Sequence, residues 1–149
     1  MRHAFALAAV LAALFATAVS AAAEEALSDR DLACLAEAVY YEARGEPVQG
    51  RAAVAYVVLN RANSGEFPQT PCAVVADGCQ FSYRCDGRPE SLAVRADRDA
   101  AFTTAKAVLT GVVADPTHGA LFFHASRIRP GWFESRTRVG KIGNHVFYR

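Results

Sequence analysis

The sequence lacks an excess of charge of either sign. Its 149 residues carry 16 Lys and Arg against 15 Asp and Glu, a formal net charge of +1 at pH 7. Proteins that bind nucleic acid normally present a surplus of basic residues, so no nucleic-acid partner is expected. Beyond the first 23 residues the chain also lacks a long apolar run. We therefore expect no stable membrane insertion once that first segment is removed.

The standard motifs for nucleophilic and cofactor chemistry are missing as well. The chain has no G-x-S-x-G elbow, no Walker-type loop, no G-x-G-x-x-G and no H-E-x-x-H, which are the signatures of serine hydrolases, nucleotide-binding proteins and zinc proteases. We expect no cofactor. A carboxylic acid acting on a polymer outside the cytoplasm is the strongest remaining candidate.

The first 23 residues have the features of a secretory signal peptide. Arg2-His3 precedes a run of small apolar residues over positions 4–19, and Ala21-Ala22-Ala23 supplies an A-x-A cleavage site. The alternative is an uncleaved membrane anchor, but the run is shorter and richer in alanine than a typical transmembrane span. We expect cleavage after residue 23, one domain over residues 24–149, and a periplasmic or secreted location.

Four cysteines in an exported chain predict two disulfides. Cys79 and Cys85 lie six residues apart in a glycine-rich stretch, so we expect them to pair across a short loop and Cys34 to pair with Cys72. A zinc site is the alternative. The four cysteines lack the close C-x2–4-C spacing of such sites, so no metal is expected.

Apolar periodicity predicts a helical lobe followed by a small β-lobe, an α+β domain. The segment 52–59 is apolar on every side, which is typical of a central core helix. The expected elements are helices over 29–43, 47–61 and 97–113, a helical turn over 70–75, an irregular loop over 77–89, and strands over 120–124 and 145–148.

Charge is distributed unevenly along the chain. Residues 24–46 hold seven acids and two bases, whereas residues 116–149 hold six bases and one acid. The two segments can pair with each other, or the basic one can meet an anionic polymer. Arg127, Arg129, Arg136 and Arg138 are candidates for contacts with substrate carboxylates or for a solvated face.

One acid continues an apolar stripe. Leu35, Val39 and Glu42 recur at helical spacing, and Gly45 then ends the predicted helix. Burial at the edge of the core disfavours a charged carboxylate and raises its pKa, which suits a proton donor. The alternative is a solvated acid in the last helical turn.

Several motifs together make the chain resemble the SleB-type cell-wall hydrolases, whose founding members are spore-cortex-lytic enzymes. The motifs follow the family order over about residues 31–149. They are AVYYEARGEP at 38–47, a block over 50–61 that ends in VLNR, FP at 67–68, QFS at 80–82, DPT at 115–117, GAL at 119–121 and KIGNHVF at 141–147.

The resemblance implies a fold like those of lytic transglycosylases and goose-type lysozymes, with a helical lobe and a small antiparallel β-lobe. It implies cleavage of the β-1,4 bond between N-acetylmuramic acid and N-acetylglucosamine in peptidoglycan. The family's catalytic glutamate is the first Glu of EARGE, which is Glu42 here. Glu46 is a weaker candidate, and we expect it to cap the second helix.

A single carboxylate suffices for a lytic transglycosylase, which forms a 1,6-anhydro product. Ordinary glycosidases need a second acid across the bond. Asp77 and Asp86 in the cysteine loop keep a muramidase-type hydrolase open as an alternative. From another class, the alternative is a non-catalytic peptidoglycan-binding module.

Residues around the loop and on the predicted strands are candidates for substrate contacts. A core role is the alternative for Phe81 and Trp132, and a structural hydrogen-bonded role for the two histidines. The candidates are Tyr41, Gln80, Phe81, Ser82, Tyr83, His124, Trp132 and His145. The cysteine loop CQFSYRCDG departs from the spore enzymes, so we expect general remodelling of peptidoglycan by a monomer.

Overall fold

A central helix, α2 (Val48–Ser64), is buried on nearly all sides and organises the rest of the chain. The computed structural model describes residues 29–149, and residues 31–149 form one unit. The expected signal peptide over residues 1–23 lies outside the described residues. A helix over residues 29–43 precedes α2, and the elements that follow are α3 (Pro71–Ala76), α4 (Arg95–Leu109), β1 (Phe122–Ala125), β2 (Arg138–Ile142) and β3 (His145–Tyr148).

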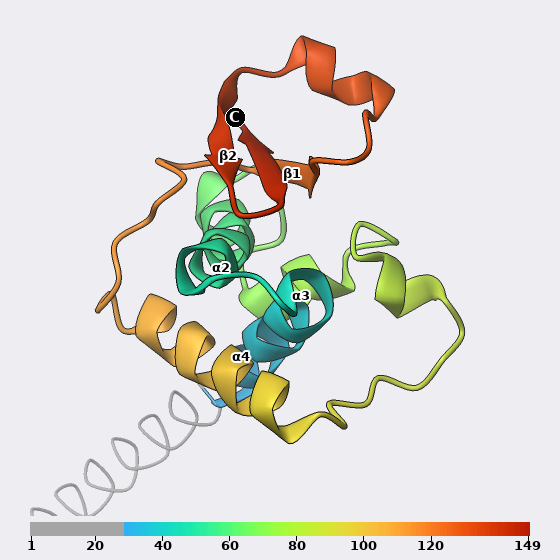
Figure 1. Ribbon diagram of the computed structural model, residues 1–149, viewed down its shortest axis with the longest axis vertical. Helices are drawn as coiled ribbons and strands as arrows, with labels where there is room; N and C mark the ends of the chain where they lie inside the picture. Colours follow the sequence, from blue (N-terminus) through green and yellow to red (C-terminus); the bar gives the residue numbers. More distant parts are fainter. Residues whose placement is uncertain (1–28) are drawn as a thin grey trace, which may run out of the picture. The chain divides into compact units, whose positions relative to one another are not determined.

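Small side chains let α2 pack closely against its neighbours. Its residues 52–58 are Ala and Val apart from Tyr56, and the helix contacts α3 and α4 as well as strands β1 and β2. In Figure 1 the sheet lies on one side of α2 and α4 lies on the other. The helix runs three residues past the predicted end at Arg61, because the left-handed backbone that ends it falls at Gly65, with φ of 77°.

The helix over residues 29–43 buries the predicted stripe. Leu35 and Val39 are fully buried, and Glu42 follows one turn later at partial burial. Gly45, with φ of 81°, turns the chain toward α2. Cys34 is bonded to Cys72 at the start of α3, so a disulfide joins these two helices.

α4 is shorter than its sequence pattern predicts. It ends at Leu109 rather than Val113, with Thr110 as its C-cap and Gly111 in the left-handed region at φ of 68°. Val112 is 79% exposed, so this position of the apolar stripe does not reach the core, whereas Val113 packs against it.

The three strands form an antiparallel sheet in the order β1-β3-β2, which confirms the predicted α+β class. β3 is buried at all four positions. On the face toward the helices, Phe123 pairs with Phe147, while His124 and Val146 pair on the outer face. Strand β2 is absent from the sequence expectation because exposed charged residues and Gly140 weaken its apolar alternation.

The loop before β1 is held by one carboxylate. Asp115 accepts hydrogen bonds from the backbone N–H and hydroxyl of Thr117, the backbone N–H of Gly119 and the side-chain amide of Asn60. Burial alone acts to raise the pKa of Asp115, but these hydrogen bonds outweigh it and lower the pKa. The end of α2 is thereby tied to the chain that enters the sheet.

Candidate active site

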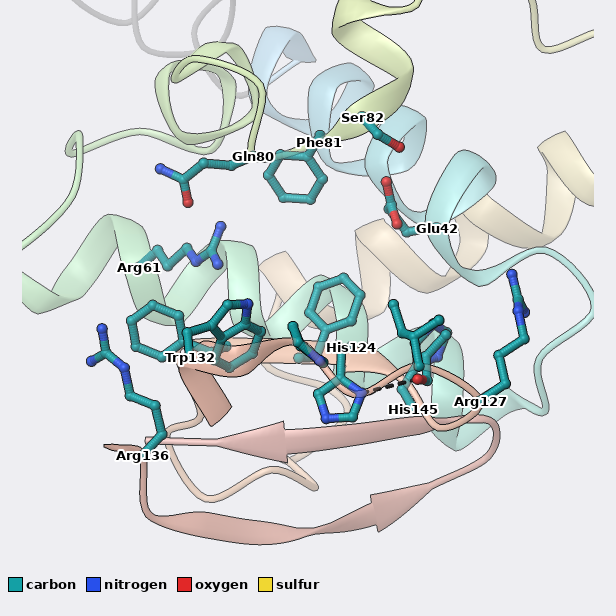
Figure 2. Close-up of a pocket in the computed structure, with 15 residues that line it drawn as sticks. Glu42, Arg61, Gln80, Phe81, Ser82, His124, Arg127, Trp132, Arg136 and His145 are labelled. Atoms are coloured by element: carbon teal, nitrogen blue, oxygen red, sulfur yellow. Dashed lines mark hydrogen bonds between the residues drawn. The ribbon is translucent and has the colours of Figure 1, made fainter. Parts of the chain in front are cut away.

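A cleft of about 580 Å³ lies between the helical part and the sheet. Its volume is in the range of small-molecule binding sites. In Figure 2, Gln80, Phe81, Ser82 and Glu42 lie on the side of the first helix and the cysteine loop, across from the residues of the sheet. The lining residues are Glu42, Arg61, Gln80, Phe81, Ser82, Phe122, Phe123, His124, Ala125, Arg127, Ile128, Pro130, Trp132, Arg136 and His145.

Glu42 is the one acidic residue in the lining of this cleft. Burial raises the pKa of its carboxyl group. No hydrogen bond or ion pair within residues 29–149 offsets that burial. The side chain projects from the last turn of its helix into the space between Ser82 and the sheet (Figure 2). Such a carboxyl group retains its proton more readily than a solvated one, as a general acid requires.

A disulfide braces the loop that carries four of the predicted substrate contacts, three of which line the cleft. Cys79 is bonded to Cys85, and a 3-10 helix, η1 (Ser82–Cys85), fills the loop. Phe81 is only 2% exposed, so it packs inward and still forms part of the cleft wall. Gln80 lines the cleft and donates to the carboxylate of Asp77 at 2.8 Å. Ser82 is exposed and lies above Glu42 in Figure 2.

Tyr41 and Tyr83 are not brought to the cleft lining. Their rings stack at 4.3 Å between centroids, and the Phe81 ring lies 6.2 Å from that of Tyr83. The Tyr41 hydroxyl also accepts from the backbone N–H of Ser91. Burial, followed by the nearby carboxylate of Glu37, raises the pKa of Tyr83. The stacked pair therefore supports the loop and does not form part of the cleft lining.

On the sheet side, His124 has a defined tautomer. Its Nδ1 lies 2.9 Å from the carbonyl oxygen of Ala125, which can only accept, so Nδ1 carries the hydrogen. In the neutral ring, Nε2, 3.0 Å from the Tyr148 hydroxyl, then accepts from it. Trp132, in the 3-10 helix η2 (Gly131–Ser135), is 40% exposed and packs edge-on to His124. Both residues line the cleft, and their contact with substrate stays a prediction.

His145 and Glu46 form a buried pair beside the cleft. His145 Nδ1 lies 3.8 Å from Glu46 Oε1 and makes no hydrogen bond. Burial lowers the pKa of His145; Glu46 acts to raise it, while Arg127 and His124 add to the lowering. The imidazole is therefore neutral at neutral pH.

The expectation that Glu46 caps the second helix is wrong. Pro47 is the N-cap residue of α2, and no side chain caps it. The Glu46 carboxylate instead accepts from the backbone N–H of Asn144 in the turn between β2 and β3. A cap prediction considers neighbours in sequence, whereas this partner is supplied by the tertiary fold.

Arg61 is a cleft residue that the sequence reasoning did not single out. Its Nε donates to the Leu121 carbonyl at 2.7 Å, and its guanidinium lies over the rings of Phe67, Phe81 and Phe122. Burial lowers its pKa to about 10, with Asp77 acting in the opposite direction, so it is charged at neutral pH. The sequence feature that could have identified Arg61 is its place in the VLNR motif.

Arg127 and Arg136 also line the cleft. Among the described residues, neither arginine forms an ion pair with a carboxylate. The acidic segment 24–46 and the basic segment 116–149 are therefore not paired through these two residues. The guanidinium of Arg136 lies 3.9 Å from the centroid of the Phe122 ring.

Both predicted disulfides are confirmed, and no free cysteine remains. Within residues 29–149, no cluster of three or more His, Cys, Asp or Glu is arranged to hold a metal ion. Over the same range, no helix has the length and apolar character needed to span a bilayer.

Comparison with protein families matches residues 45–148 to the Cell Wall Hydrolase family. The match begins three residues after Glu42. A spore cortex-lytic enzyme of Halalkalibacterium halodurans is 40% identical over 125 residues, which cover 80% of this chain and 35% of that protein. The spore cortex-lytic enzyme of Bacillus subtilis is 35% identical over 132 residues, covering 87% of this chain and 41% of that protein. The chain therefore spans well under half the length of these relatives.

Two solved structures share the fold. The catalytic domain of the germination-specific lytic transglycosylase SleB of Bacillus anthracis aligns with a TM-score of 0.69 and 34% identity, covering 80% of this chain and 93% of that domain. The catalytic domain of the Bacillus cereus SleB protein aligns with a TM-score of 0.65 and 32% identity, covering 81% and 91%.

Proposed function

We propose that this chain, which belongs to the cell wall hydrolase family, is an enzyme that cleaves peptidoglycan. The names of its relatives, spore cortex-lytic enzyme and lytic transglycosylase, support this assignment. The bond cleaved is the β-1,4 linkage between N-acetylmuramic acid and N-acetylglucosamine. The product carries a 1,6-anhydro ring on the muramic residue.

The observation that carries the proposal is the environment of Glu42. It is the one carboxyl group in the lining of the cleft, and burial raises its pKa. Retaining and inverting glycosidases place two carboxyl groups about 5–10 Å apart across the scissile bond. A cleft with one acid fits a reaction in which the substrate supplies its own nucleophile.

The mechanism has two proton transfers through the same residue. Protonated Glu42 donates to the glycosidic oxygen as the bond from that oxygen to C1 of the muramic residue breaks. The resulting carboxylate then accepts the proton of that residue's C6 hydroxyl, whose oxygen forms a bond to C1. Glu42 is protonated again at the end of the cycle, so the reaction consumes no water and needs no second acid.

Hydrolysis by a muramidase mechanism is the alternative within enzymes, and it needs a second acid. Asp77 and Asp86 do not belong to the cleft lining. Asp77 accepts from Gln80, and Asp86 accepts from the backbone N–H of Arg88. Both carboxylates are thus engaged within the loop, which favours the transglycosylase.

Substrate binding is assigned to the two walls of the cleft. Gln80 and Ser82 offer hydrogen bonds to N-acetyl and hydroxyl groups, and Trp132 offers a ring face to a sugar. His124 and His145 contribute from the sheet, and Phe81 forms the apolar wall. Tyr41 and Tyr83 act through the position of the loop.

We further propose that the protein works as a monomer outside the cytoplasm, in general remodelling of peptidoglycan. Two disulfides within one short domain support an oxidising compartment.

The test is mass spectrometry of the muropeptides released from purified sacculi by the oxidised protein. Products one water lighter than muramidase products are expected, and the Glu42→Gln variant should release none. Reducing-end products would instead establish hydrolysis. A wild-type protein that binds sacculi but releases nothing would identify a binding module.

A further inference from the structure

A second hollow, of about 550 Å³, lies on the outer face of the sheet. Val146 and Tyr148 of β3 form part of its floor, and Phe133 of η2 lines it as well. Four cations line it against a single acid, Glu134. The cations are Arg129, Arg136, Arg138 and Lys141.

None of these four cations has an ion-pair partner among the residues that the structure describes. Some arginines elsewhere on the described surface are paired with carboxylates. Arg84 pairs with Glu37 and Glu90, and Arg95 pairs with Asp99. The hollow therefore keeps a formal charge of +3 next to a concave aromatic surface, which attracts an anionic ligand.

The hollow adjoins the cleft. His124, Ile128 and Arg136 line both of them. A ligand that enters the hollow can therefore be part of the same molecule that lies across Glu42.

We propose that this hollow, named here the sheet-face site, binds the carboxylates of the stem peptide carried by the muramic residue in the cleft. This inference rests on the proposed function. A stem of four residues extends about 13–14 Å from the sugar, enough to pass from a cleft into an adjoining hollow. Its carboxylates can accept paired hydrogen bonds from the guanidinium groups of the arginines. Its short aliphatic side chains can pack against the rings of Tyr148 and Phe133. Recognition of the stem selects glycan strands that bear peptides over bare polysaccharide.

The test measures binding of a synthetic tetrapeptide stem by calorimetry, with its carboxylates either free or amidated. The variant is Arg138→Gln/Lys141→Gln, two exposed residues of β2 outside the cleft lining. The matched control is Arg95→Gln/Lys106→Gln, which removes the same charges from exposed positions on α4. The peptide alone contains no glycosidic bond, so its binding is independent of cleavage.

We expect the β2 variant to bind the free peptide at least tenfold more weakly than wild type, and the α4 control to stay within twofold. Amidation of the peptide should weaken binding to the wild type to the same extent. On peptide-bearing strands the β2 variant should show a raised KM with kcat unchanged. Equal binding of the peptide by wild type and the β2 variant would overturn the proposal. So would tight binding of inorganic polyphosphate without binding of the peptide, which would assign the site to phosphate polymers.

Discussion

The carboxylate of Glu46 accepts a hydrogen bond of 2.9 Å from the backbone N–H of Asn144, 98 positions further along the chain. Glu46 lies in the corner between the first helix and α2, and Asn144 lies in the turn between β2 and β3. The contact therefore holds the sheet against the helices next to His145. Because the cleft lies between these two parts, this one hydrogen bond helps to set the distance across which Glu42 faces the sheet.

Gly143 is required beside that contact. A Cβ atom at position 143 meets Glu46 Oε2 at 1.9 Å, and its backbone φ of 57° already disfavours any other residue. We expect Gly143→Ala to lower the free energy of unfolding by roughly 2–4 kcal/mol, since it combines overpacking with backbone strain. Urea denaturation measures the change. Gly140→Ala is the control, because nothing lies within 4 Å of its Cβ position; equal losses for the two variants would contradict the assignment.

The carboxyl group of Glu42 should lower the free energy of unfolding at neutral pH. Its pKa is raised by burial, so between its ordinary value of 4.5 and its folded value the folded state binds more protons than the unfolded state. Stability from this group is present at low pH and is lost as pH rises through that window. Glu42→Gln should therefore raise Tm at pH 7 and leave it unchanged near pH 3. The exposed Glu66→Gln serves as the control and should shift Tm at neither pH.

The same carboxyl group should set the alkaline limb of the activity profile. A general acid must be protonated, so kcat/KM falls as pH rises through its pKa, which burial places above 4.5. The rate of muropeptide release across pH checks this. Circular dichroism over the same range separates titration from unfolding, and an alkaline limb centred at or below 4.5 would rule out Glu42 as the proton donor.

The two disulfides should have separable effects. Removing Cys34–Cys72, with a sequence separation of 38, should cost about 4 kcal/mol of stability in the chain-entropy model, against about 2 kcal/mol for Cys79–Cys85 with its separation of 6. The second bond encloses Gln80 and Ser82, so Cys79→Ser/Cys85→Ser should reduce kcat/KM roughly tenfold by loosening the cleft wall. Thermal unfolding and single-substrate kinetics on each double variant provide the comparison. Similar kcat/KM values for the two would contradict a positioning role for the loop.

The helices and the acid were predictable because their signals are local. The positions of Leu35, Val39 and Glu42 depend only on helical spacing, and Gly45 ends the helix through its own backbone freedom. The Cys79–Cys85 pair followed from the short loop between its cysteines, and Cys34–Cys72 was the pair that remained. The end of α4 and the existence of β2 were missed, because the first depends on where apolar residues find a core and the second on pairing with β3.

The sequence by itself determined the helical lobe, the two cross-links and the candidate acid. The helices, the Cys79–Cys85 bond and the acid depend on residues close together in the chain or on a short motif, and Cys34–Cys72 is the pair that then remains. Only the tertiary structure decided which residues share the cleft with Glu42. Arg61 lines the cleft because burial and three aromatic rings hold its guanidinium there. Tyr41 and Tyr83 do not line it, because their rings stack on each other. The partner of Glu46 was likewise decided by the fold, because a buried carboxylate takes whichever donor the packing brings within reach.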